Sequence, residues 1–102
     1  MIAREWRARA AAPGPYHEVF TGQVASELTA VPGFRGAYLL ARPDGPETVL
    51  RTLTLFDALD DVRAFAGPAY EREHVTSAAR AVILGSDPVI RHYDVLAQVP
   101  GR

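Results

Sequence analysis

The stretch FRGAYLLARPDGPETVLRTLTLF, residues 34–56, decides the fold class. Its two ends, 34–42 and 48–56, are rich in aromatic, β-branched and leucine residues, a composition typical of β-strands. Between them PDGPE, at 43–47, supplies the turn-forming residues that a short hairpin requires. An antiparallel β-hairpin is therefore predicted near the middle of the chain.

The second strand of this hairpin carries apolar side chains on both faces. Because neighbouring strand residues point to opposite sides, Val49, Leu53 and Leu55 share one face, and Leu50 and Phe56 share the other. A sheet with one face in water alternates more strictly between apolar and polar residues. We therefore expect both faces to be covered, one by helices and the other by a second copy of the chain.

The segment before the hairpin predicts one strand and one helix. IAREWRARA, at 2–10, alternates with a period of two, as a strand does, and places Arg4 on the face of Trp6. From Tyr16 to Val31 the apolar residues recur at helical spacing, until Pro32 and Gly33 end the pattern. An amphipathic helix with one buried side is expected there.

The segment after the hairpin completes the order of elements. Asp57 is expected to cap a short helix that stops at Gly67. Pro68 is then expected to begin another helix, followed by a break at 85–88 and a last strand at 89–99. This βαββαβ order predicts an α+β, ferredoxin-like fold, with a four-stranded antiparallel sheet and helices on one face. We expect a single domain over residues 1–102.

Composition excludes several classes of function. The chain has no cysteine, so it has no disulfide, thiolate metal site or cysteine nucleophile. Its net charge is -1 and it has no basic patch, so binding to nucleic acid is not expected. The three histidines lie in different predicted elements without metal-ligand spacing, so no metal site is expected. The sequence shows neither a signal peptide nor a membrane span, so we expect a cytoplasmic protein with no membrane partner.

Several stretches resemble the antibiotic biosynthesis monooxygenase family of the dimeric α+β barrel superfamily. They are MIAREWR, VPGFRGAYLLAR, TLTLFDALDDVRAFAG, the spacing from Tyr70 to His74, and VIRHYDV. The resemblance covers nearly the whole chain and is more specific for the fold than for the reaction. It implies a homodimer of ferredoxin-like units, each with a pocket between helices and sheet. Members of the family oxygenate aromatic, quinol-type substrates without flavin or metal, degrade haem, or have no known activity. Relatives in the wider superfamily cyclise polyketides.

The resemblance to the haem-degrading members is incomplete. Those members have a histidine that corresponds to His74, a tryptophan where this chain has Phe65, and an asparagine on the first strand. This chain contains no asparagine at all. The resemblance therefore implies that haem is not degraded and that no cofactor is needed, while a contact of His74 with haem iron stays open.

Two histidines and a tyrosine are candidate catalytic residues. Tyr70 and His74, four residues apart, share one face of the predicted helix. His74 is a candidate acid–base group and Tyr70 a hydrogen-bond donor to a phenolic substrate, and the alternative is an ordinary patch of helix surface. His92 shares a strand face with Asp94, which is near enough to orient its imidazole. The alternative for His92 is an inert position at the dimer interface.

Five residues are candidates for substrate binding. Trp6, Phe20 and Tyr38 are expected to face inward and, together with Phe65, to line an apolar pocket for a flat aromatic ligand. The alternative for each ring is a place in the plain core. Arg51 interrupts an apolar strand face and either binds a substrate phenolate or carboxylate, or pairs across the dimer with a glutamate, Glu5, which we favour.

The leading hypothesis is a cofactor-independent monooxygenase that acts on an aromatic, polyketide-like or quinol small molecule. A substrate hydroxyl would lose its proton, and the resulting anion would reduce dioxygen inside a cavity shielded from water. One alternative is a polyketide cyclase or isomerase, which needs only acid–base groups. The other is a non-catalytic dimer that binds a small hydrophobic metabolite.

Overall fold

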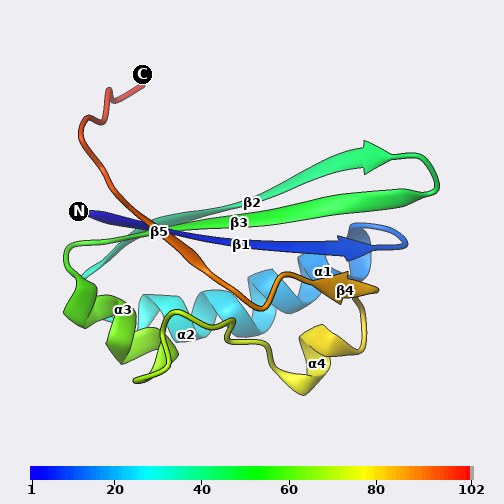
Figure 1. Ribbon diagram of the computed structural model, residues 1–102, viewed down its shortest axis with the longest axis horizontal. Coiled ribbons are helices and arrows are strands. Elements are labelled where there is room, and N and C mark those ends of the chain that lie inside the picture. Colours follow the sequence, from blue (N-terminus) through cyan, green and yellow to red (C-terminus); the bar gives the residue numbers. More distant parts are fainter. Residues whose placement is uncertain (102) are drawn as a thin grey trace.

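The computed structural model describes residues 1–101 and confirms the predicted ferredoxin-like architecture (Figure 1). The elements, in chain order, are β1 (Ile2–Ala10), α1 (Gly14–Val19), η1 (Phe20–Val24), α2 (Ala25–Thr29), β2 (Phe34–Asp44), β3 (Glu47–Phe56), α3 (Leu59–Ala66), α4 (Ser77–Arg80), β4 (Gly85–Ser86) and β5 (Arg91–Asp94). No helix among residues 1–101 is long and apolar enough to cross a lipid bilayer.

The strands form one antiparallel sheet in the order β2–β3–β1, and both β4 and β5 pair with the outer edge of β1. The hairpin of β2 and β3 turns at Gly45, whose φ of 61° is the positive value that a tight hairpin turn requires of its first central residue. All the helices lie on one face of the sheet, and the opposite face is bare (Figure 1). Alternate residues of β3 are buried under the helices, and those between them are half-buried.

The last strand differs from its prediction because the chain leaves the sheet midway. Residues 85–86, expected as a break, form β4 and pair with β1. At Val89 the chain turns away from β1 and bridges to Arg72. It returns to β1 only as β5, so the expected strand at 89–99 is reduced to four residues.

The helix predicted from Pro68 is wrong, since residues 67–76 form an irregular loop and only α4 is helical. Gly67 ends α3 with a φ of 82°. Beyond it, the Glu73 N–H donates to the Pro88 carbonyl, and the Glu71 carbonyl accepts from the Ile90 N–H. These bonds to a distant segment occupy backbone groups that a helix would use internally, so tertiary pairing outweighs helical propensity here.

The start of α3 also lies one residue later than predicted. Ala58 is the N-cap, and its N–H donates to the Asp61 carboxylate at 3.1 Å. Asp57, the predicted cap, instead accepts a 2.8 Å hydrogen bond from Arg35 on β2. The ion pair with Arg35 therefore takes the carboxylate that would otherwise cap the helix.

The first predicted helix is present from residue 14 to residue 29, but its middle turn, η1, is a π-helix. The apolar residues Tyr16, Phe20, Val24 and Leu28 follow one another at intervals of four. At 3.6 residues per turn, each such step overshoots one turn of an α-helix by about 40°. A π-turn holds more residues than an α-turn, so η1 compensates for this drift and keeps the four side chains toward the sheet.

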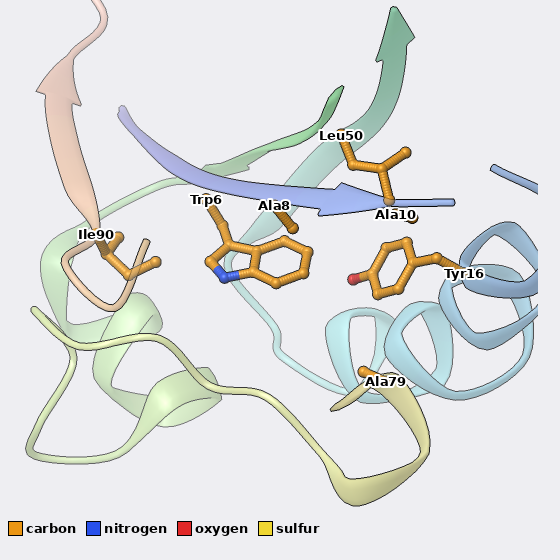
Figure 2. Close-up of a cluster of buried hydrophobic side chains, with 7 residues drawn as sticks. All are labelled: Trp6, Ala8, Ala10, Tyr16, Leu50, Ala79 and Ile90. Carbon is orange, nitrogen blue, oxygen red and sulfur yellow. The ribbon is translucent and has the colours of Figure 1, made fainter. Parts of the chain in front are cut away.

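The core beneath the helices is divided into two clusters. One surrounds Trp6 and Tyr16 (Figure 2), and the other surrounds Leu28 and Phe56. Between the two clusters, the floor of the sheet is polar and comprises Arg4, Thr52 and Thr54, all buried. The break in the apolar floor places a hollow between the clusters.

Candidate active site

A cavity of about 40 Å³ lies between the two core clusters. Its floor is formed by sheet residues, and its walls come from the α1–η1–α2 helix, from α3, and from the loop that carries His74. The lining residues are Arg4, Trp6, Tyr16, Phe20, Val24, Glu27, Thr52, Thr54, Phe65, His74, Val75, Thr76, Ala79 and Ile90. The cavity has room for roughly three water molecules.

Four of the predicted site residues line this cavity, namely Trp6, Phe20, Phe65 and His74. Their rings form two groups. Trp6 packs on Tyr16 with ring centroids 5.3 Å apart, and Tyr16 lies 6.4 Å from Phe20. On the other side, Phe65 meets the His74 ring edge-on at 5.2 Å. An aromatic lining with a histidine at its edge is therefore present.

His74 is held by a carboxylate that was not predicted. Its Nε2 lies 3.1 Å from Oε2 of Glu27 on α2. Close by, Thr76 Oγ1 donates a 2.7 Å hydrogen bond to Oε1 of Gln23. Both contacts join the 67–76 loop to the helix across one side of the cavity. The imidazole and its carboxylate partner are half-exposed there, where a proton can pass between a ligand and solvent.

Tyr70 and His92 lie beside the cavity and contact each other, with ring centroids 5.6 Å apart. Because residues 67–76 are not helical, Tyr70 and His74 do not share a helical face as predicted. His92 Nε2 lies 3.2 Å from Nη1 of Arg4, and within residues 1–101 it forms no hydrogen bond with Asp94. Burial and the positive charge of Arg4 lower the pKa of His92, so the neutral ring accepts this hydrogen bond.

Tyr38 and Arg51 lie on the bare face of the sheet, away from the cavity. Tyr38 is 59% exposed, so its predicted inward position is wrong. The reason is a β-bulge between Phe34 and Gly36, because an extra residue in a strand moves all later side chains to the opposite face. Arg51 lies 3.7 Å from Glu5 of its own chain, so the ion pair expected across the dimer forms instead within one chain, because β1 and β3 are adjacent strands.

Glu73 fixes the position of Trp6, and it was not predicted as a site residue. Its carboxylate accepts hydrogen bonds from Trp6 Nε1 at 3.0 Å, from Ser86 Oγ at 2.6 Å and from Arg80 Nη2 at 2.6 Å. Burial alone raises the pKa of Glu73, but the three hydrogen bonds outweigh it and hold that pKa below its ordinary value. The ionised carboxylate thus links the loop to β1, α4 and β4.

Arg4 is a buried cation on the floor of the cavity, with 4% of its surface exposed. Its guanidinium donates to the carbonyls of Tyr70 and Arg72 and to the His92 ring. Among residues 1–101, no carboxylate forms an ion pair with it. Burial lowers the pKa of Arg4 to about 10, so it remains charged at neutral pH.

Tyr16 places a hydroxyl among the apolar rings, pointing toward Trp6 (Figure 2). The residue is 3% exposed, and burial raises its pKa to about 12, so the hydroxyl keeps its proton. Within the described part of the chain this hydroxyl makes no hydrogen bond, and it is not fully enclosed by protein atoms. The same residues 1–101 contain no group of three His, Asp or Glu side chains able to hold a metal ion.

Comparisons with known proteins show the fold. No protein-family model matches the sequence, and no curated protein is significantly similar to it. Among solved structures, SnoaB, a cofactor-independent oxygenase from Streptomyces nogalater, superposes with a TM-score of 0.66 at 20% identity, over 98% of this chain and 96% of its own. The monooxygenase ActVA-Orf6 of Streptomyces coelicolor, solved with nanaomycin D, gives 0.63 at 20% identity, over 98% and 92%.

A haem degrader has a similar structure as well. MhuD from Mycobacterium tuberculosis, solved with two haems in its active site, gives a TM-score of 0.57 at 22% identity, over 98% of this chain and 100% of its own. The fold is thus common to a cofactor-independent oxygenase, a monooxygenase and a haem degrader, and it does not by itself select a reaction. The chain has the ferredoxin-like fold of the antibiotic biosynthesis monooxygenases, as its sequence motifs had indicated.

Proposed function

We propose that the protein is a cofactor-independent monooxygenase acting on a quinol or polyketide-like aromatic molecule. One observation carries the proposal, namely an aromatic cavity with a carboxylate-paired imidazole, His74–Glu27, at its edge. The fold is that of SnoaB, a cofactor-independent oxygenase. The alternatives of ring closure and of passive binding require the same cavity, but no further feature of the site favours either.

The proposed reaction begins with proton transfer from a substrate hydroxyl to His74. Glu27 orients the imidazole and stabilises the imidazolium that forms. A ring carbon of the electron-rich anion then forms a bond to dioxygen, and the imidazolium returns its proton to give a hydroperoxide. Loss of the hydrogen on that carbon and cleavage of the O–O bond leave one oxygen atom as a ring carbonyl and release the other as water, so the substrate supplies all the electrons. The rings of Trp6, Phe20 and Phe65 exclude bulk water from the anion during this step.

Substrate entry requires the cavity to widen. Its volume of about 40 Å³ is far below the several hundred Å³ of a typical ligand pocket. The contacts that keep the loop on the helix, His74–Glu27 and Thr76–Gln23, are exposed or half-exposed, so they break more readily than a buried contact. Movement of the 67–76 loop away from α2 is the proposed opening.

A homodimer formed through the bare sheet face is part of the proposal. That face presents Tyr38, Leu40 and Tyr93, all exposed, beside half-buried Leu53 and Leu55. Exposed apolar residues gathered on one face are typical of a protein–protein interface. A second copy of the chain would cover them sheet against sheet.

The test is oxygen uptake with a panel of hydroquinones and anthrones. We expect uptake with at least one compound, and we expect His74→Ala to reduce its rate by roughly a hundredfold, the usual contribution of a general base. The matched control is His17→Ala, which removes an exposed histidine of α1 outside the cavity and should leave the rate unchanged.

Two outcomes would contradict the proposal. If no compound of the panel supports oxygen uptake, but several raise the melting temperature, the protein is a binder of such metabolites. If His74→Ala lowers the melting temperature and leaves the rate unchanged, the histidine only holds the loop.

A further inference from the structure

Among residues 1–101, three arginines are at least partly buried, namely Arg4, Arg7 and Arg51, and Arg4 differs from the other two in its partners. Arg7 and Arg51, on the bare face, both pair with the Glu5 carboxylate at 3.3 Å and 3.7 Å. Arg4 is more deeply buried than either, yet its partners within residues 1–101 are two carbonyls and a neutral ring. A buried charge is strongly destabilising unless an opposite charge accompanies it. The missing negative charge is the observation that points to a ligand.

Tyr16 gives a second and independent indication. The residue is 3% exposed and lines the same cavity, and its hydroxyl has no hydrogen-bond partner among the described residues. The hydroxyl is not fully enclosed by protein atoms, so it is accessible from the cavity. Hydroxyl groups of buried residues are nearly always hydrogen-bonded to protein, water or a ligand. Because its raised pKa keeps the proton on the oxygen at neutral pH, this hydroxyl is available as a donor to an acceptor atom in the cavity.

The surroundings of these two groups limit the kind of ligand. Trp6 and Phe20 flank Tyr16, and Phe65 lies under the guanidinium of Arg4, whose Cζ is 5.9 Å from the ring centroid. Flat aromatic surfaces on several sides suit a planar ring better than an aliphatic chain. The polar groups between them are donors, so they suit a ligand that carries acceptor oxygens.

We propose that the cavity binds a planar aromatic ligand in its anionic form, with the ionised oxygen on Arg4 and a further hydrogen bond from Tyr16. Arg4 supplies the charge and Tyr16 the orientation. The inference rests on the proposed function, because the same cavity would hold the substrate. It adds that the substrate is bound as a phenolate, enolate or carboxylate, since Arg4 stabilises the ionised form over the neutral one.

The test compares two ligands that differ in charge. 2-Hydroxy-1,4-naphthoquinone is ionised at neutral pH, and 1,4-naphthoquinone is uncharged and nearly the same size. Since the chain has one tryptophan, and Trp6 lines the cavity, quenching of its fluorescence reports binding there. The absence of cysteine removes the thiol that would otherwise react with a quinone. We expect the anion to bind at least about tenfold more tightly, as for a hydrogen-bonded charge pair.

Three variants assign this preference to residues. Arg4→Gln should abolish it and Arg4→Lys should retain part of it, because lysine keeps the charge. Tyr16→Phe removes one oxygen atom and should weaken binding of the anion by about tenfold. The matched control is Arg9→Gln, which makes the same change of charge on the other face of β1, in an exposed position. It should leave the preference unchanged.

Equal affinity for the two ligands, or a preference that survives in Arg4→Gln, would overturn the inference, as would failure of both to bind the wild type. If circular dichroism shows that Arg4→Gln is unfolded, the wild-type ligand pair and Tyr16→Phe decide the question alone. Anion preference without oxygen uptake by any hydroquinone would leave this inference standing and refute the monooxygenase proposal. Oxygen uptake without anion preference would refute this inference and leave the monooxygenase proposal standing.

Discussion

The two faces of β1 handle charge in opposite ways. On the bare face, Glu5 lies between Arg7 and Arg51 and also accepts a hydrogen bond from the Tyr93 hydroxyl at 3.3 Å. On the helix face, Arg4 lies on a cavity and has only uncharged partners among residues 1–101. The first arrangement has its charges paired within one chain, while Arg7 Nε has no hydrogen-bond partner among residues 1–101. The second lacks a negative charge, and it is the one that a ligand can complete.

The apolar residues also differ in their exposure between the two faces of the sheet. Under the helices they fill two closed clusters, and on the bare face they stay exposed around the Glu5 group. A broad surface with paired charges at its centre suits a protein partner, whereas a cavity with a cation that lacks an ion-pair partner suits a small anionic molecule. The comparison supports the proposal that one face of the sheet binds a second copy of the chain and the other binds a ligand.

Leu53→Asp tests the bare face and should have the largest effect. Leu53 pairs with Glu5 in the register of β1 and β3, so the new carboxylate would lie beside an existing one in the centre of the proposed interface. We expect the dimer dissociation constant to rise by at least about a hundredfold, or about 2.7 kcal/mol. Sedimentation velocity at micromolar concentration measures the change.

The control for this variant is Thr29→Asp, which adds the same charge to an exposed position of α2 and should leave the sedimentation coefficient unchanged. If the wild-type protein sediments as a folded monomer, the bare face is not a dimer interface.

Glu73→Ala tests the helix face and should have an intermediate effect. The substitution leaves the Trp6 indole N–H, Ser86 and Arg80 without their common acceptor. We expect the free energy of unfolding to fall by about 2 to 3 kcal/mol, the usual consequence of leaving a buried donor unpaired. Urea titration followed by Trp6 fluorescence measures this, and the exposed neighbour Glu71→Ala should change stability by less than about 0.5 kcal/mol. Equal effects of the two substitutions would show that Glu73 does not anchor Trp6.

The smallest expected effect is a pH dependence that originates at His92. Its pKa is lower in the folded protein than its ordinary 6.5, through burial first and the charge of Arg4 second, while Glu71 acts in the opposite direction. The unfolded chain therefore takes up the proton first as the pH falls, so stability is complete above pH 6.5 and declines below it. The free energy of unfolding of the wild type should decrease from pH 7.5 to pH 5.5.

The control for this dependence is His92→Gln, which keeps an acceptor for Arg4 and cannot titrate in that range. Its unfolding free energy should decrease less over the same interval. If the unfolding free energies of the two proteins decrease equally as the pH falls, the titration of His92 is not the cause of the pH dependence.

The sequence was sufficient to predict those elements whose hydrophobic periodicity and turn residues agree. The hairpin at 34–56 and the alternation of β1 follow from turn residues and periodicity, and both are confirmed. Trp6, Phe20, Phe65 and His74 do line one cavity, although His74 reaches it from a loop and not from the predicted helix, and their roles in binding or catalysis stay a prediction. The polar floor had a sequence signal too, because Arg4 occupies an inward position between apolar residues of β1.

The sequence was insufficient where distant segments determine the outcome. The 67–76 loop has the composition of a helix, but it pairs with 88–90 and is anchored through Glu73, and neither interaction has a local signature. Tyr38 lies on the face opposite to the predicted one, because one bulge shifts all later residues of β2. Glu27 became the partner of His74 only because the loop folds back on α2.

The π-helical turn lets this helix change its length by one residue without turning the site. Gly22 lies within that turn, is exposed, and has nothing within 4 Å of the place where a side chain would begin. If this glycine were deleted and the turn closed into an α-helix, Leu28 would lie eleven residues after Tyr16 instead of twelve. Eleven steps of about 100° amount to three full turns and about 20°, so Leu28 would still face the sheet and Glu27 would still face His74. A change of length by one codon is therefore tolerated at this turn, whereas the same change elsewhere in the helix would rotate everything beyond it.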